Sequence, residues 1–245
     1  MSEIMTRKLK TLRLPWIQEN YAAEATNAAR KNWPHATYLE RLIDGEIESR
    51  LANAVRRRLQ AARLPGVRTL EQFNMEWPKN INRDQVRQLF TLQFMEQKNN
   101  VVFIGGVGLG KTHLATALAV EACKRNLHVL FVPAVEMVQN LSAAAAAGNL
   151  QQMLRRYLKP QLLICDELGF LGIDRNGADL LFQVLNGRYE RASTVITTNR
   201  VYRDWVLTFN NDTTITSAVL DRIMHHCETV TIEGRSYRMK GRVSD

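Results

Sequence analysis

The sequence contains little cysteine and no long apolar segment. Only three of its 245 residues are cysteines, and Cys123, Cys165 and Cys227 are widely spaced. An odd number at such spacing is not typical of a disulfide framework or a metal site, and it favours free thiols in a reducing compartment. No apolar run approaches the roughly 18 residues of a membrane span, and the polar, basic start of the chain lacks the apolar core of a signal peptide. These absences lead us to expect a cytoplasmic protein with no membrane partner.

Acidic residues are outnumbered overall and missing from one long stretch. The chain has 33 Lys and Arg against 24 Asp and Glu, which gives a net charge of +9. Between Arg50 and Arg68 there are six arginines and no acid. Such a stretch can be a solvated helix face whose basic end suits the helix dipole, but it also fits contacts to phosphates. We favour the second interpretation and predict that five of these arginines bind DNA: Arg50, Arg56, Arg57, Arg58 and Arg63.

The first part of the chain, residues 1–75, is expected to form a small helical domain. Leu64-Pro65-Gly66 ends a long helical pattern. Before it, six apolar side chains recur every four residues and place one stripe on a helix: Leu39, Ile43, Ile47, Leu51, Val55 and Leu59. Because one helix cannot bury its own stripe, we expect it to pack in a bundle with helices formed earlier in the chain.

In residues 76–245, short apolar runs of β type alternate with helical patterns. The expected helices include Leu114–Lys124, Val135–Ala147 and Ala178–Tyr189. The expected strands are Val101–Ile104, Val129–Val132, Leu162–Cys165, Thr194–Thr198 and Thr229–Ile232. This alternation is typical of a parallel sheet covered by helices on both faces. The predicted class is therefore an α/β fold with a five-stranded parallel sheet, preceded by an all-α domain that ends at residue 75.

A glycine-rich phosphate loop follows the first expected strand. The run Gly105-Gly106-Val107-Gly108-Leu109-Gly110-Lys111-Thr112 fits the pattern G-x-x-x-x-G-K-[ST] between a strand and an amphipathic helix. Its glycines permit a backbone that points N–H groups at phosphate oxygens, and the helix N-terminus adds partial positive charge. We expect Lys111 to reach the β- and γ-phosphates of ATP and the Thr112 hydroxyl to ligate Mg²⁺.

Polar side chains are expected at the ends of two further strands. Asp166 and Glu167 follow one apolar run, and Asn199 follows the next. Because the carboxyl ends of parallel strands meet at one crevice, these residues are expected at the nucleotide. Asp166 would complete the Mg²⁺ shell, Glu167 would orient and polarise the attacking water, and Asn199 would reach the γ-phosphate or that water. The second carboxylate is typical of an ATPase and not of a kinase that acts on a metabolite.

Four segments between Val101 and Arg238 resemble the AAA+ superfamily. Within it, the double histidine and the C-terminal segment resemble the IstB-like transposition helpers of insertion sequences more than the related DnaC-type helicase loaders. The segments are Gly110-Lys111-Thr112-His113, Asp166-Glu167-Leu168-Gly169, the turn Leu220-Asp221-Arg222-Ile223 with His225-His226, and Ile232-Glu233-Gly234-Arg235-Ser236-Tyr237-Arg238. Ala61–Leu64 and Thr69–Phe73 are also similar to that family's helical domain.

The resemblance implies further site residues. It implies that His113 belongs to the ATP-binding loop, that Arg222 is an arginine finger in a neighbouring subunit's site, and that Arg238 is a second sensor. The family therefore implies a homo-oligomer with ATP at its subunit interfaces. AAA+ ATPases usually carry a helical lid after the sheet, but the segment that follows Arg222 is too short for a full one.

Two functions remain open from the sequence. The family implies a bacterial ATPase that oligomerises on double-stranded DNA with ATP, organises the target, and recruits and stimulates a cognate transposase, with hydrolysis resetting the assembly. The alternative is a DnaC-like loader acting at single-stranded DNA, although the helical domain lacks the aromatic platform of single-strand binders. A free-standing metabolic ATPase or kinase is disfavoured because no acceptor-binding residues are identifiable.

His225 and His226 are interpreted as packing or surface residues, since adjacent helix residues face different directions.

Overall fold

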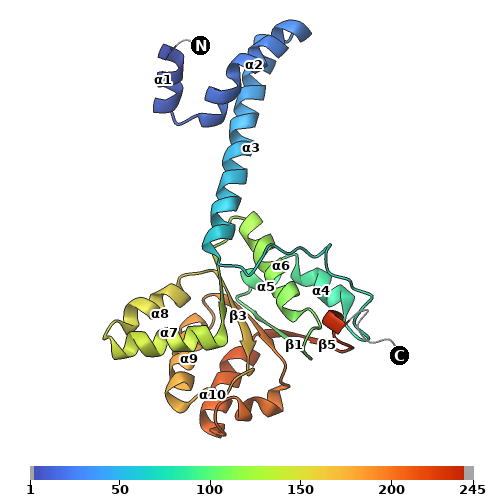
Figure 1. Ribbon diagram of the computed structural model, residues 1–245, viewed down its shortest axis with the longest axis vertical. Coiled ribbons are helices and arrows are strands. Elements are labelled where there is room, and N and C mark those ends of the chain that lie inside the picture. The colour runs from blue at the N-terminus through green and yellow to red at the C-terminus, as the bar shows by residue number, and fades with distance from the viewer. Residues whose placement is uncertain (1–2, 240–245) are drawn as a thin grey trace. The chain divides into compact units, whose positions relative to one another are not determined.

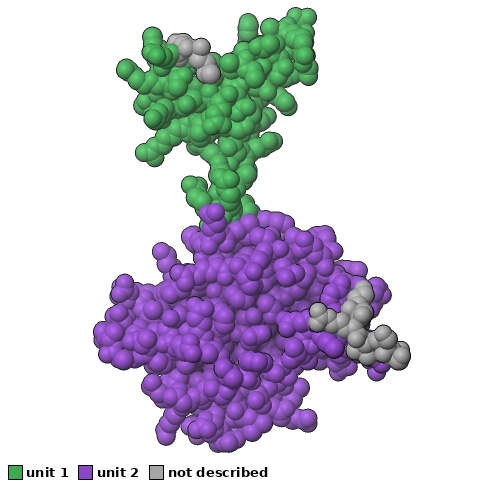
Figure 2. Space-filling view, viewed as in Figure 1, with its two compact units in different colours: residues 1–57 green, residues 58–245 purple. Residues whose placement is uncertain are grey.

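The computed structural model describes residues 3–239 and divides the chain into two units, Met1–Arg57 and Arg58–Asp245 (Figure 2). The boundary therefore falls earlier than residue 75, where the sequence pattern placed it. Packing explains the difference, because Ala62 is fully buried in a core of the second unit. Its carbonyl also accepts a hydrogen bond from the Phe131 N–H at 2.8 Å, which attaches this segment to the sheet.

Within its described residues, the regular secondary structure of the first unit is all helical (Figure 1). It contains α1 (Glu3–Thr11), α2 (Pro15–Lys31) and most of α3 (His35–Ala61). Pro15 occupies the first position of α2, where a missing N–H leaves no helical hydrogen bond unmade. Within residues 3–239, no helix has both the length and the apolar character that crossing a membrane requires.

A buried carboxylate holds α2 and α3 together. Glu46 of α3 is only 4% exposed, and its Oε2 accepts hydrogen bonds from the backbone N–H groups of Trp16 and Ile17 at 3.0 and 3.2 Å. These are N-terminal N–H groups of α2, which lack partners within their own helix. The two helices can approach closely because Gly45 has no Cβ. A Cβ at this position would lie 2.2 Å from the Trp16 ring.

The apolar stripe of α3 is not buried as the sequence pattern predicted. Leu39, Ile43, Ile47 and Leu51 are between 45% and 56% exposed in the structure. The side of α3 that carries Leu42, Gly45 and Glu46 meets α2 instead, because the carboxylate contacts and the glycine set the rotation of the helix. The expected helices therefore form, but the side chains expected in a bundle interior lie on the surface.

The second unit is built on the predicted five-stranded parallel sheet. Its strands are β1 (Asn100–Gly105), β2 (Val129–Pro133), β3 (Leu162–Leu168), β4 (Ser193–Thr198) and β5 (Cys227–Ile232), in the order β2-β3-β4-β1-β5. Every neighbouring pair is parallel. Alternate residues of β1 enter two separate cores, Val102 and Ile104 on one face and Val101 and Phe103 on the other, as the two-residue period of a strand requires.

Helices cover both faces of this sheet. Residues of α7 (Ala134–Ala146), α8 (Leu150–Leu158), α9 (Arg175–Arg188) and α10 (Thr213–Met224) enter one core, and those of α4 (Arg83–Leu89), α5 (Gln93–Glu96) and α6 (Lys111–Lys124) enter the other. The three expected helices are confirmed as α6, α7 and α9, whereas the segment expected as a turn around Arg222 lies within α10. In the described part of the chain, only the 3₁₀ helix Tyr237–Met239 follows β5, so no lid is formed there.

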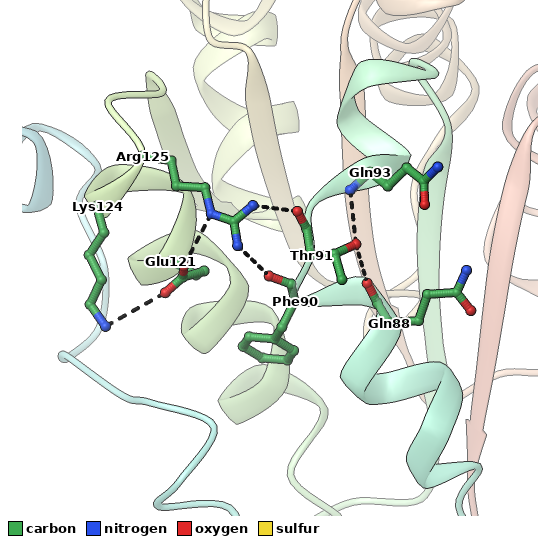
Figure 3. A network of polar contacts seen from close by, with 7 residues as sticks. All are labelled: Gln88, Phe90, Thr91, Gln93, Glu121, Lys124 and Arg125. Carbon is green, nitrogen blue, oxygen red and sulfur yellow. Dashed lines mark hydrogen bonds and ion pairs between the residues drawn. The ribbon is translucent and has the colours of Figure 1, made fainter.

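One arginine attaches the turn between α4 and α5 to the end of α6 (Figure 3). The Arg125 guanidinium donates to the carbonyls of Phe90, at 3.0 Å, and of Thr91. It also donates to Glu121 Oε1 at 3.2 Å, and the Lys124 ammonium lies 3.6 Å from the other oxygen of that carboxylate. The C-terminal end of α6 is therefore anchored, while its N-terminal end carries the phosphate loop.

A second arginine is buried at the edge where α8, α9 and β4 meet. Arg188 is 2% exposed and donates to Thr194 Oγ1 at 3.0 Å. Its other donors bond the carbonyls of Tyr157, Pro160 and Ser193 at 2.5 to 2.9 Å. Burial lowers the pKa of the guanidinium to about 10. The Arg188 guanidinium thus donates to four acceptors, and each of them would lose this donor if the side chain were replaced.

Replacing this cation should destabilise the fold. We expect Arg188→Met to lower the free energy of unfolding by about 3 kcal/mol, since it leaves buried carbonyls without donors. Urea unfolding followed by circular dichroism measures the change. Arg203→Met is the matched control, because the Arg203 side chain is 86% exposed and its loss should cost less than about 0.5 kcal/mol. Equal losses in the two variants would contradict the role given to Arg188.

Candidate nucleotide-binding site

The phosphate loop lies between the end of β1 and the start of α6. Two of its glycines have backbone conformations that side chains rarely adopt, with φ of 77° at Gly108 and 89° at Gly110. They also lack room for a side chain. A Cβ at Gly108 would lie 2.0 Å from Ser236 Oγ, and one at Gly110 would lie 2.5 Å from the Phe73 ring. Glycine is therefore required at both positions, by the backbone conformation and by the neighbouring side chains.

A cavity of about 580 Å³ opens at this loop. It lies at the carboxyl ends of the strands, where ligands bind in open α/β sheets. Ten of the residues predicted from the sequence line it: Val107, Gly108, Leu109, Gly110, Lys111, Thr112, His113, Glu167, Asn199 and Arg238. The remaining two loop positions have other roles, because Gly105 packs on the Ile232 carbonyl and Gly106 supplies a backbone acceptor.

The two predicted metal ligands touch each other. The Thr112 hydroxyl lies 3.0 Å from Asp166 Oδ1 and 3.2 Å from Oδ2, and Asp166 is only 6% exposed. A second hydroxyl, that of Thr197, donates to Asp166 Oδ1 at 2.6 Å. Hard oxygen donors of this kind are the ligands that Mg²⁺ prefers, so Thr112 and Asp166 fit the predicted ion.

Lys111 lies among charges of both signs. Its ammonium donates to the Gly106 carbonyl at 2.7 Å. Burial is the main cause that lowers the pKa of Lys111, and the positive charge of Arg238 acts in the same direction. The carboxylates of Asp166 and Glu167 act against this and raise the pKa. A polyphosphate in the cavity would add negative charge beside Lys111 and Arg238, two cations that lie close together.

His113 joins the cavity wall to α6. Its Nε2 lies 2.8 Å from the Thr69 carbonyl, and because a carbonyl only accepts, this nitrogen carries the proton. Burial lowers the pKa of the imidazole, the bond to Thr69 opposes that change, and Arg68 reinforces it. The ring also meets the edge of Phe73, with 5.5 Å between the ring centroids. His113 therefore lines the cavity, although one of its nitrogens is used to position the Thr69 segment.

The segment Pro65–Pro78 forms a wall of the cavity that the sequence did not reveal. Its residues Arg68, Gln72, Phe73 and Trp77 line the space opposite the phosphate loop. The Trp77 indole donates to the Arg235 carbonyl at 2.9 Å, which links this wall to the C-terminal segment. This bond joins residues 158 positions apart, and no local sequence pattern predicts it.

Arg222 does not line the cavity of its own chain. Its guanidinium lies 4.8 Å from the centroid of the Tyr189 ring and 3.5 Å from Asp221 Oδ2. The Tyr189 hydroxyl in turn lies 2.6 Å from His225 Nδ1. The position of Arg222 on α10 is compatible with an arginine finger in a neighbouring subunit's site. That role stays a prediction.

The histidine pair has an acidic neighbour that sequence spacing did not reveal. His226 Nε2 lies 3.6 Å from Glu190 Oε1, and the possible ligand atoms of Glu190, His225 and His226 lie within 4.8 Å of one another. All three residues are exposed. His226 Nε2 contacts Glu190, and His225 Nδ1 contacts the Tyr189 hydroxyl. The pair therefore lies on the surface, and Tyr189 contacts both His225 and Arg222.

The five arginines predicted to bind DNA have different surroundings. Arg50, Arg56 and Arg57 are exposed residues of the first unit, and Arg50 pairs with Glu46 at 2.8 Å. Arg58 and Arg63 belong to the second unit. The Arg58 side chain is half-buried, and its Nε has no hydrogen-bond partner among the described residues. Arg50 is thus partly committed to the fold, while Arg56, Arg57 and Arg63 are exposed.

Comparison with known proteins decides the family. The family model described as IstB-like ATP binding protein matches residues 7–244. The chain belongs to this IstB-like family. Its relatives include a Pseudomonas aeruginosa protein named for ATP binding and for insertion sequence IS21, 37% identical over 97% of this chain and 88% of the relative. Another, named likewise for IS5376 of Geobacillus stearothermophilus, is 34% identical over 98% of this chain and 95% of the relative.

Solved structures confirm the AAA+ fold of this IstB-like protein. The DnaC helicase loader matches with a TM-score of 0.54 at 20% identity, over 72% of this chain and 99% of that one. The replication initiator DnaA, bound to AMPPCP and single-stranded DNA, matches with a TM-score of 0.59 at 24% identity, over 73% of this chain and 54% of that one. At these identities the likeness shows the fold alone.

The IstB-like phosphate loop should not tolerate a side chain at Gly108. We expect Gly108→Ala to weaken ATP binding at least tenfold, because alanine is strained at this φ and its Cβ overlaps Ser236. Titration with a fluorescent ATP analogue measures the affinity. Gly66→Ala is the control, since nothing lies within 4 Å of the added Cβ, and it should bind as the wild type does. Unchanged affinity in Gly108→Ala would show that this loop does not hold phosphates.

Proposed function

We propose that this protein hydrolyses ATP and uses the ATP-bound state to assemble on duplex DNA during transposition. One observation carries the proposal. Thr112 and Asp166 form a contact at the phosphate loop that suits Mg²⁺, and a second carboxylate, Glu167, lines the same cavity. That pairing of carboxylates supports hydrolysis by water and not phosphoryl transfer to a metabolite.

The residues expected from the sequence at this site have distinct parts in the proposed reaction. Lys111 and the loop N–H groups bind the phosphates, and Thr112 with Asp166 would hold Mg²⁺, which would supply charge neutralisation. Glu167 orients the attacking water and accepts its proton. Asn199 orients the water or the γ-phosphate from the end of β4, and Arg238 adds positive charge.

The proposed partners follow from charge and family. The chain has a net charge of +9 and exposed arginines at positions 56, 57 and 63, which suit the phosphate backbone of DNA. Relatives are named for insertion sequences. We therefore propose that ATP-bound copies oligomerise on target DNA in the bacterial cytoplasm and recruit and stimulate a transposase, and that hydrolysis resets the assembly.

Glu167→Gln should separate ATP binding from hydrolysis. We expect hydrolysis to fall at least ~100-fold, because an amide cannot accept the water proton, while ATP affinity stays within about threefold. Phosphate release and analogue titration measure the two quantities. ATP with Mg²⁺ should also cause the variant to sediment with a long duplex, and to remain there longer than the wild type.

Two outcomes of that experiment would contradict the proposal. If ATP does not increase sedimentation with duplex DNA, the protein is not an ATP-assembled platform on DNA. Binding confined to single strands, together with a stable complex with a hexameric helicase, would instead favour a loader like DnaC, whose fold this chain shares.

Arg222→Ala tests whether the site is completed by a second copy. We expect hydrolysis per molecule to fall about 10³-fold, as for loss of an arginine finger, and wild-type hydrolysis to rise with protein concentration. Arg203→Ala is the control, since that side chain is exposed and, among residues 3–239, forms an ion pair with its neighbour Asp204 alone. Wild-type turnover that is fast and independent of concentration would overturn the shared site.

A further inference from the structure

The end of β3 contains a bulge at its two acidic residues. The register of β3 on β4 shifts by one residue between Cys165 and Leu168. As a result, Asp166 and Glu167 stand opposite a single residue of β4, Thr197. A bulge of this kind redirects side chains that a regular strand would send to opposite faces. Here it leaves one carboxylate on Thr112 and the other in the cavity.

The hydroxyl of Thr197 bonds to both bulged residues. Thr197 is fully buried, and its Oγ1 donates to Asp166 Oδ1 at 2.6 Å. The same oxygen accepts a hydrogen bond from the backbone N–H of Glu167 at 2.9 Å. A hydroxyl has one donor and two acceptor sites, so a single side chain can make both bonds.

The second bond supports an uncommon backbone conformation. Glu167 has φ of 59°, in the left-handed region that costs a residue with a side chain about 1–2 kcal/mol. Its N–H would otherwise have no ladder partner, because the bulge removes it from the regular pairing. The bond to Thr197 offsets this cost and fixes the direction in which the Glu167 side chain leaves the strand.

We propose that Thr197 is a positioning residue for the carboxylate pair of the ATP site. It holds Asp166 in contact with Thr112 and fixes the backbone turn that presents Glu167 to the cavity. Thr197 does not line the cavity itself, so it acts through these two residues and not on the nucleotide. The inference rests on the proposed ATP hydrolysis and adds a residue to that site.

Thr197→Val tests this role, because valine keeps the shape of the side chain and removes the hydroxyl. We expect kcat for ATP hydrolysis to fall about 10–100-fold, as is usual when a partner that orients a ligand is lost. The KM for ATP and the affinity for a fluorescent ATP analogue should stay within about threefold, since the phosphate loop is unchanged. Thr197→Ser restores the hydroxyl and should keep kcat within about threefold of the wild type.

A matched control removes a buried hydroxyl that makes no bond. Thr208 is 1% exposed, and its Oγ1 has no hydrogen-bond partner among the described residues. Thr208→Val should leave kcat unchanged. If Thr197→Val does not fold in thermal unfolding experiments, Thr197→Cys makes the same test, because a thiol is only a weak donor and acceptor.

The outcomes separate this inference from the proposed function. A wild type that hydrolyses ATP together with a Thr197→Val variant of equal kcat would overturn the inference alone. An equal loss of kcat in Thr197→Ser and Thr197→Val would also overturn it, because the hydroxyl would then not be the cause. A wild type that binds ATP but never hydrolyses it, with or without duplex DNA, would overturn the proposed function and this role with it.

Discussion

The contact between the Thr112 hydroxyl and Asp166 joins the first turn of α6 to the end of β3. All other parts of the site are arranged around it. The phosphate loop must curve so that α6 begins beside this carboxylate, and β3 must lie next to β4 so that Thr197 can bond it from the other side. A parallel sheet brings these ends to one side, which is why residues at the ends of β1, β3 and β4 can line a single cavity.

Buried polar groups perform much of the positioning in both units. Glu46 satisfies the first N–H groups of α2, Arg188 satisfies carbonyls near the amino ends of β3 and β4, and Thr197 bridges the bulge in β3. Each of them makes several hydrogen bonds, as a buried polar group must if it is not to destabilise the fold. Apolar packing forms the cores, but these few bonds decide the directions of the elements and of the side chains at the site.

Long-range contacts give the cavity its second wall. Pro65–Pro78 lies outside the strand and helix pattern of the nucleotide-binding fold, yet it closes the space in front of the phosphate loop. His113 and Trp77 hold this segment through backbone carbonyls. The lining residues of the cavity all belong to the second unit.

The sequence by itself determined the five strands, the phosphate loop and the acidic pair, because local periodicity and fixed spacing encode them. The sequence also indicated the family, through segments that lie at the same cavity or on α10. The tertiary structure alone decided the wall formed by Pro65–Pro78, the bulge opposite Thr197, and the face of α3 that meets α2. Each of these depends on pairing between residues far apart in the chain, and spacing along a sequence holds no record of such contacts. The stripe of α3 shows the limit most clearly, since its helical period was right while a buried glutamate and a glycine decided which side is covered.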